Sequence, residues 1–93
     1  MKTIVVLVDF TEGSLIALKQ AESLASRSNI KIIGLHVVTS SNKISDTEIQ
    51  LKEFMDKNIK STIDYEAKVC EGSLIPAIKS ALKKISPDLV LVC

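Results

Sequence analysis

The sequence predicts an α/β domain, a three-layer sandwich in which helices cover both faces of an open parallel β-sheet. Short apolar runs alternate with segments whose apolar residues recur at helical spacing, so the 93 residues give the order β-α-β-α-β-α-β. The runs 3–8 (TIVVLV) and 30–38 (IKIIGLHVV) are rich in β-branched and aliphatic residues, which is typical of parallel strands buried on both faces. A chain of this length makes one domain, and we expect right-handed crossovers between its strands.

Capping residues mark where the first two predicted helices begin. After the first strand, Thr11 or Ser14 can accept a hydrogen bond from the free N–H groups of a helix that continues to Arg27. Ser45 and Glu48 have the spacing of a capping box, which predicts the start of the second helix. Both segments carry apolar residues at spacings of three and four, so each helix should cover the sheet with one face.

The third strand, predicted over residues 62–69, differs in kind from the first two. Its apolar and polar side chains alternate strictly, which suits a strand with one wet face at the edge of the sheet. Ser73 then caps a third helix that has Pro76 in its first turn, and the apolar run 89–93 forms a fourth strand. If the third strand lies outermost, the strand order is 3-2-1-4, a Rossmann-like arrangement.

The charge pattern argues against nucleic acid as a partner, because the net charge is +1 and the lysines are scattered along the chain. The longest apolar runs have five residues, far short of a membrane span, and only two residues precede the first strand, too few for a signal peptide. We therefore expect a cytoplasmic protein without a membrane partner. Cys70 and Cys93 lack metal-ligand spacing and should be free thiols in that compartment.

An open α/β sheet binds ligands beyond the carboxyl ends of its strands, where the strand order reverses. Asp9 follows the first strand, and His36 and Val37 end the second, so these residues should form the floor of a pocket. A lone histidine at an apolar strand end is typical of a hydrogen-bonded structural residue, not of a metal ligand or a catalytic base. Gly13 and Ser14 lack the lysine that a P-loop requires. No nucleophile, base and orienting residue occur together, so we expect no catalysis.

Four segments of the chain have the order and spacing found in a known family. They are residues 8–11 (VDFT) after the first strand, 36–38 (HVV) at the end of the second, Gly72 before the third helix, and 86–92 (SPDLVLV) at the fourth strand. In this arrangement the sequence resembles the N-terminal portion of the universal stress protein (UspA-like) family. The resemblance extends over the whole chain but only over the front part of a family member.

The resemblance implies an adenine-nucleotide alpha-hydrolase-like fold and, in complete members, binding of ATP or AMP. It places the adenosine end of the nucleotide against Leu7, Asp9, Phe10, Thr11 and Val37. The family's triphosphate lies on a glycine-rich loop after the fourth strand, and that loop, a fourth helix and a fifth strand are not found in residues 1–93. The resemblance therefore implies a non-catalytic stress-response domain, residues 1–93, whose nucleotide binding is weak or lost.

Two other functions stay open. One is a nucleotide-free interaction module that works as a homodimer. The fourth strand has one neighbour in the predicted order, so its free edge, from Leu89 to Cys93, should pair with or be covered by a second copy. The other is a receiver-like signalling domain, which is disfavoured because a single Asp9 replaces the usual acidic pair and Val69 leads into Cys70 instead of an aspartate.

Overall fold

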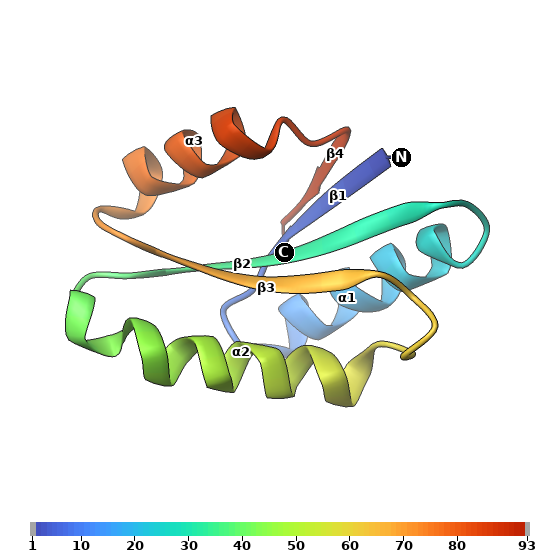
Figure 1. Cartoon of the computed structure of the whole chain (residues 1–93), viewed down its shortest axis with the longest axis horizontal. Coiled ribbons are helices and arrows are strands. Elements are labelled where there is room, and N and C mark those ends of the chain that lie inside the picture. The colour runs from blue at the N-terminus through green and yellow to red at the C-terminus, as the bar shows by residue number, and fades with distance from the viewer. Residues whose placement is uncertain (1, 93) are drawn as a thin grey trace.

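The computed structural model describes residues 2–92 and has the predicted order of alternating strands and helices. The elements are β1 (Lys2–Leu7), α1 (Glu12–Ala25), β2 (Ile30–Val38), the 3-10 helix η1 (Ser41–Lys43), α2 (Ile44–Asn58), β3 (Tyr65–Glu71), α3 (Leu74–Ile85) and β4 (Leu89–Leu91). All four strands are parallel and lie in the order β3-β2-β1-β4, so the predicted order 3-2-1-4 is confirmed (Figure 1).

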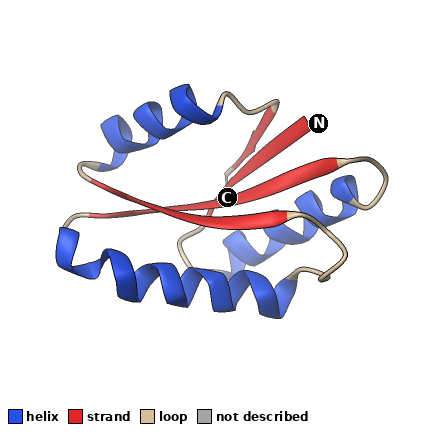
Figure 2. Cartoon of the chain, viewed as in Figure 1, coloured by secondary structure: helices blue, strands red, loops and turns tan. Residues whose placement is uncertain are grey.

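Helices cover both faces of the sheet, as a three-layer sandwich requires: α1 and α2 lie on one face and α3 on the other (Figure 2). Alternate residues of a strand point to opposite faces, so Ile4 and Val6 of β1 join the core beneath α1 and α2, whereas Val5 joins the core beneath α3. The first core is the larger, and Leu51 of α2 is fully buried in it. Of α3 itself only Ala81 is buried, so α3 covers its face of the sheet incompletely.

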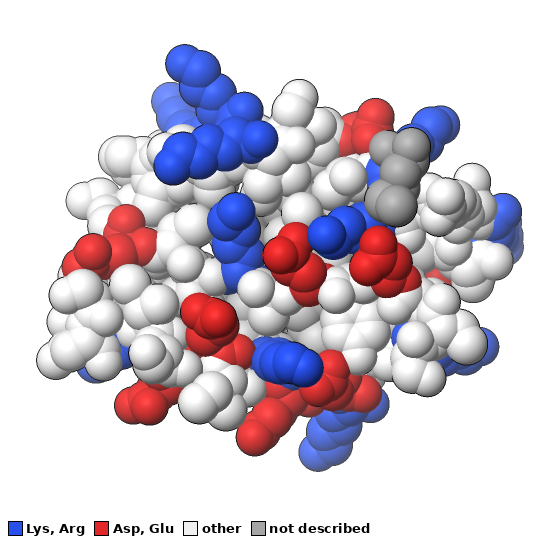
Figure 3. All heavy atoms as spheres, viewed as in Figure 1, with Lys and Arg blue, Asp and Glu red and all other residues white. Residues whose placement is uncertain are grey.

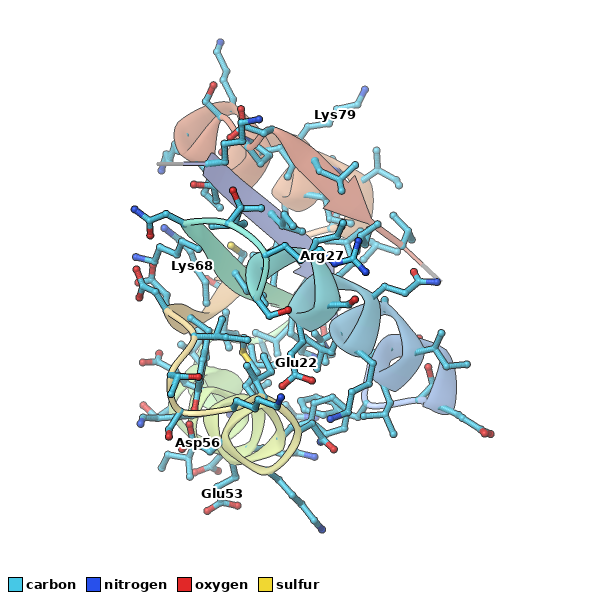
Figure 4. The ribbon with its side chains drawn as sticks, turned by 90° about the vertical axis from the view of Figure 1, so that its right-hand side faces the viewer. Glu22, Arg27, Glu53, Asp56, Lys68 and Lys79 are labelled. Carbon is cyan, nitrogen blue, oxygen red and sulfur yellow. The ribbon has the colours of Figure 1, made fainter. Side chains whose placement is uncertain are left out.

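Charge is distributed unevenly between these two faces. The exposed surface of α3 carries Lys79, Lys83 and Lys84 and no acidic residue, whereas α2 carries more acidic residues than lysines. Basic side chains accordingly gather over α3 and acidic ones over α2 (Figure 3). Seen from the side, Lys79 points outward at one end of the molecule and Glu53 of α2 at the opposite end (Figure 4).

Among residues 2–92, no helix is long and apolar enough to cross a bilayer.

The predicted start of the third strand is wrong by three residues. β3 begins at Tyr65, because residues 60–64 form a turn in which the Ile63 N–H donates to the Lys60 carbonyl at 3.1 Å. The pairing of β3 with β2 then runs on to Glu71, two residues past the predicted end. Side chains in the turn continue the polar and apolar alternation of the strand, so the pattern alone does not show where pairing starts.

The capping box predicted from Ser45 and Glu48 is also wrong. The helix η1 leads directly into α2, so the N-cap position falls on Lys43, and Ser45 lies inside the helix without capping it. In α3 the predicted N-cap position, Ser73, is confirmed, although its hydroxyl makes no capping hydrogen bond, and Pro76 lies in the first turn as expected. The residue before α2, Lys43, is already helical, so the capping motif does not mark the start of this helix.

Gly34 in β2 allows the side chain of Met55 in α2 to lie directly against the strand backbone. Both residues are buried, and Met55 is fully inaccessible to solvent. A Cβ atom added to Gly34 would lie 2.5 Å from the Met55 Sδ atom and 2.9 Å from its Cε atom. The φ angle of Gly34 is not positive, so helix packing, and not the backbone angle, requires glycine at this position.

Gly34→Ala should therefore lower the free energy of unfolding by about 1–3 kcal/mol, because Met55 must leave its rotamer in a packed core. Urea unfolding of the two chains measures the difference. Gly34→Ala combined with Met55→Ala should cost at least about 1 kcal/mol less than the sum of the single changes. Strict additivity in this double-mutant cycle would show that the two residues do not compete for the same space.

Candidate functional site

The carboxyl ends of β1 and β2 and the start of α3 enclose a cleft of about 340 Å³, within the range of roughly 300–1,000 Å³ typical of small-molecule sites. Asp9 and His36 are its polar lining residues. Its apolar lining residues are Leu7, Val8, Leu35, Val37, Leu74, Ile75, Ile78 and Val92. The cleft lies beside the reversal of strand order between β1 and β4, where a ligand site is expected in an open α/β sheet.

The first turn of α1 holds the Asp9 carboxylate in place. Its Oδ1 atom accepts hydrogen bonds from the Thr11 N–H at 3.1 Å and from the hydroxyls of Thr11 and Ser14. The buried Ser14 hydroxyl also accepts from the Asp9 N–H at 2.8 Å, so Ser14 ties both the backbone and the side chain of Asp9. The Oδ2 atom makes no hydrogen bond with any residue from 2 to 92. One carboxylate oxygen therefore anchors the turn, and the other remains available to a ligand.

These hydrogen bonds lower the pKa of Asp9 from its ordinary value of 3.8 to about 2. The hydroxyl of Ser14 has the largest effect, followed by the hydroxyl and N–H of Thr11, because each stabilises the charged form of the carboxyl group. Asp9 is consequently ionised at neutral pH. Its side chain is exposed to solvent, so the hydrogen bonds orient the carboxylate and contribute little to stability.

Phe10 and Thr11, which the family resemblance places at the nucleotide, do not line the cleft. Thr11 is the N-cap of α1, where its hydroxyl accepts a hydrogen bond from the Ser14 N–H at 3.3 Å. Phe10 has a φ angle of 64°, which is uncommon outside glycine. Its ring lies 5.0 Å from that of His36 and 5.5 Å, edge to face, from that of Phe54 in α2. These two residues shape the turn that carries Asp9.

The structure brings Leu7, Asp9 and Val37 together in one cleft, and the binding role of all five predicted residues stays a prediction. The α3 residues that line the cleft were not predicted from the sequence. The helical spacing of α3 predicts a core stripe that includes Ile75, but Ile75 is 57% exposed and Leu74 is 61% exposed at the mouth of the cleft. Two apolar residues directly after the N-cap serine are the signal that was available.

His36 makes a hydrogen bond, as its sequence context predicts. Its Nδ1 atom lies 2.5 Å from the carbonyl oxygen of Val8, and since a carbonyl only accepts, Nδ1 carries the proton and donates. Among residues 2–92, no three or more His, Cys, Asp or Glu side chains gather as they would around a metal ion. The hydrogen bond of His36 joins the end of β2 to the residue after β1, and these two strand ends form the floor of the cleft.

Ser14→Ala should raise the pKa of Asp9 from about 2 towards 3.8, because it removes the hydrogen bond with the largest effect. A carboxyl group whose pKa is lower in the folded state than in the unfolded state stabilises the fold at pH values above its unfolded-state pKa. This stabilisation is lost as the pH falls through the folded-state pKa. The variant should thus lose less stability than the unchanged chain between about pH 4 and pH 2.

Carboxyl chemical shifts followed by NMR during an acid titration measure this pKa directly. Ser23→Ala on the exposed side of α1 is the matched control and should leave the Asp9 titration unchanged. An Asp9 pKa near 2 in Ser14→Ala would show that the hydroxyl does not hold the carboxylate.

The sequence matches the Universal stress protein family over residues 1–93. No curated protein matches it in sequence. The structure is similar to that of protein Rv1636 from Mycobacterium tuberculosis H37Rv, with a TM-score of 0.72 and 22% identity over 98% of this chain and 69% of that one. It is also similar to a universal stress protein family protein from Arabidopsis thaliana with AMP bound, with a TM-score of 0.75 and 21% identity over 99% of this chain and 75% of that one.

A universal stress protein in complex with cAMP is a third similar structure, with a TM-score of 0.72 and 22% identity over 96% of this chain and 69% of that one. At these identities the likeness shows the fold alone, a parallel sheet with helices around it in the Rossmann-like arrangement. The family match extends from the first residue to the last. The chain therefore belongs to the universal stress protein family.

Proposed function

We propose that this chain is a universal stress protein domain that binds the adenosine end of an adenine nucleotide, ATP or AMP, at the cleft beside Asp9. The observation that carries the proposal is the ionised Asp9 carboxylate, which keeps one oxygen available at the edge of an apolar cleft. Apolar walls suit a purine ring, and a carboxylate oxygen accepts hydrogen bonds from ribose hydroxyls. The similar structures with cAMP and with AMP bound support a ligand of this class.

The five predicted residues then have two kinds of role. Leu7 and Val37 form the apolar floor on which the base lies, and Asp9 accepts from the ribose. Thr11 orients the Asp9 carboxylate through its N–H and its hydroxyl, and Phe10 anchors the same turn against α2. A residue that positions the carboxylate in this way affects binding without touching the ligand.

The affinity of the described cleft should be modest, because its volume of about 340 Å³ lies near the lower limit for small-molecule sites. We expect the nucleotide to be bound and not turned over, since no nucleophile, base and orienting residue occur together in the sequence. The domain acts by binding, as a cytosolic stress-response protein.

Nucleotide binding should raise the melting temperature of the chain. At about 1 mM AMP and a Kd of about 0.3 mM, the free energy of unfolding rises by about 0.9 kcal/mol, which for a domain of this size is about 3–7 °C. Amide signals of Asp9, Val37 and the start of α3 should shift in NMR spectra, while those of α2 should not. In Asp9→Asn the amide oxygen can still accept a hydrogen bond from the Ser14 hydroxyl, but the negative charge is lost. The Kd of this variant for AMP should therefore rise about fivefold.

Glu53→Gln is the matched control, because it removes an exposed carboxylate from α2, away from the cleft. It should leave the Kd unchanged. A melting temperature and spectrum that do not respond to about 1 mM AMP, or to ATP with magnesium, would refute binding by this chain.

A second candidate function, a homodimeric interaction module, is favoured by the free edge of β4. This strand pairs with β1 alone among the strands of the described chain, and Leu89 in β4 and Val92 just after it are 40% and 65% exposed. An apolar edge strand is a template for pairing with another chain. The proposed interface extends from Leu89 onward along this edge. Cys93, its predicted last residue, lies outside the described residues.

Leu89→Lys should weaken such a dimer about tenfold or more, because burying a leucine at an interface contributes about 1.5 kcal/mol or more. Sedimentation equilibrium over about 1–100 µM measures the dissociation constant. Ile49→Lys is the control, since Ile49 is equally apolar and 60% exposed but lies on α2. A monomeric unchanged chain at about 50 µM would exclude the homodimer.

A further inference from the structure

The outer edge of β3 has a residue order that fits a second copy of itself. We infer that two chains pair antiparallel along β3, about a two-fold axis at Ala67, so that their sheets join into one. Among the strands of residues 2–92, β3 pairs with β2 alone and forms one edge of the sheet. β4 forms the opposite edge, so this contact and the proposed β4 interface involve different residues. The inference is separate from nucleotide binding.

The backbone of β3 presents hydrogen-bonding groups along this edge. The Asp64 carbonyl accepts from β2 and the Gly72 N–H donates to β2, both at 2.9 Å, and the register of the two strands is continuous between these bonds. Backbone groups of successive residues in a strand point to opposite sides. The even-numbered residues of β3 therefore bond to β2, and the N–H and carbonyl groups of Tyr65, Ala67 and Val69 point outward.

Space remains between β3 and each neighbouring helix. A groove of about 310 Å³ lies between α2 and β3, with Lys52 and Tyr65 among its lining residues. A second groove of about 280 Å³ lies between β3 and α3, with Lys68 and Ser80 among its lining residues. A strand added to the edge directs alternate side chains to the two faces of the sheet. These grooves can receive such side chains, as in other cases of strand addition.

The side chains of β3 are complementary to those of an antiparallel copy. With Ala67 opposite Ala67, Glu66 lies opposite Lys68 of the second copy, and Tyr65 lies opposite Val69. The two-fold axis forms each of these unequal pairs twice. Because the backbone groups of Ala67 point outward, the Ala67 pair is hydrogen-bonded, and Glu66 meets Lys68 in a non-hydrogen-bonded pair, where side chains are closer. Opposite charges in this position stabilise strand pairing.

Like charges are kept farther apart in this register. The two Glu66 side chains lie on a diagonal of roughly 7–8 Å, against roughly 4.5–5.5 Å for residues directly opposite each other. Within its own chain Glu66 pairs with Lys31 of β2 at 3.0 Å, so its carboxylate would lie between two lysines. Charged residues on an edge strand commonly prevent pairing with other chains. The order of charges in β3 permits it with a copy of this strand.

Two charge reversals test the pairing, each made in a Leu89→Lys parent that weakens the β4 interface. Glu66→Lys places two lysines at the edge and Lys68→Glu places two carboxylates there, so each variant alone should associate about tenfold or more weakly than the parent. In an equimolar mixture every lysine faces a carboxylate of the other variant. Its association should return to within about threefold of the parent, measured by sedimentation equilibrium over about 5–500 µM.

Glu53→Lys and Lys57→Glu are the matched controls, because they make the same charge changes at exposed positions of α2. Alone and mixed, they should associate like the parent. Glu66→Lys also loses the ion pair with Lys31, so circular dichroism is used to show that this variant is folded. A parent that is monomeric up to about 500 µM would overturn the inference, as would a mixture that associates no better than its separate components.

Ala67→Cys tests the register, in a chain that also carries Cys70→Ser and Cys93→Ser. Residue 67 lies opposite itself with the two Cα atoms about 5.5 Å apart, within reach of a disulfide. Mild oxidation should therefore give a linked dimer. Val69→Cys in the same background is the control, because the two copies of residue 69 are four positions apart, about 14 Å. Equal linking of both variants, or none in either, would contradict the proposed register.

Discussion

The hydrogen bonds around Asp9 determine how β1 is joined to α1, and the geometry of the candidate site depends on that junction. Ser14 accepts from the Asp9 backbone and donates to its carboxylate, so the end of the first strand and the start of the first helix are fixed to one another. Phe10 can then occupy a positive φ angle, because the residues on either side of it are held. The same bonds use one oxygen of the carboxylate and leave the other for a ligand. The hydrogen bonds at the start of α1 therefore also orient the carboxylate of the candidate site.

The unequal covering of the sheet explains why the cleft is open on one side. On one face α1 and α2 bury a continuous core that includes Leu18 and Met55. On the other face a single helix, α3, buries Ala81 and leaves its first turn exposed. Parallel strands normally require cover on both faces. The cleft and the exposed apolar turn of α3 therefore both lie on the less covered face of the sheet.

Most of the fold could be predicted from the sequence, because its strands are marked by local composition and the strand order follows from one edge-type strand. β2 has the predicted bounds, residues 30–38, and β1 is displaced by one residue. Asp9 and Val37 could be placed in the cleft because parallel strand ends meet at one edge of a sheet. The different use of the two Asp9 oxygens could not be predicted, since it depends on how the carboxylate is oriented in the turn between β1 and α1, which residue types alone do not show. The capping motif at Ser45 failed for a similar reason, namely the conformation of the preceding loop.

The contact between Met55 and Gly34 also determines how the domain responds to oxidants. Met55 is fully buried, and its sulfur lies against the backbone of β2, so peroxide reaches it only when α2 separates from the sheet. The rate of sulfoxide formation at Met55 is then set by how often that opening occurs. Once formed, the sulfoxide is larger and more polar than the thioether, and the space beside Gly34 cannot accept it without loss of packing. Oxidation at this residue would convert a brief opening of α2 into a lasting change in the domain.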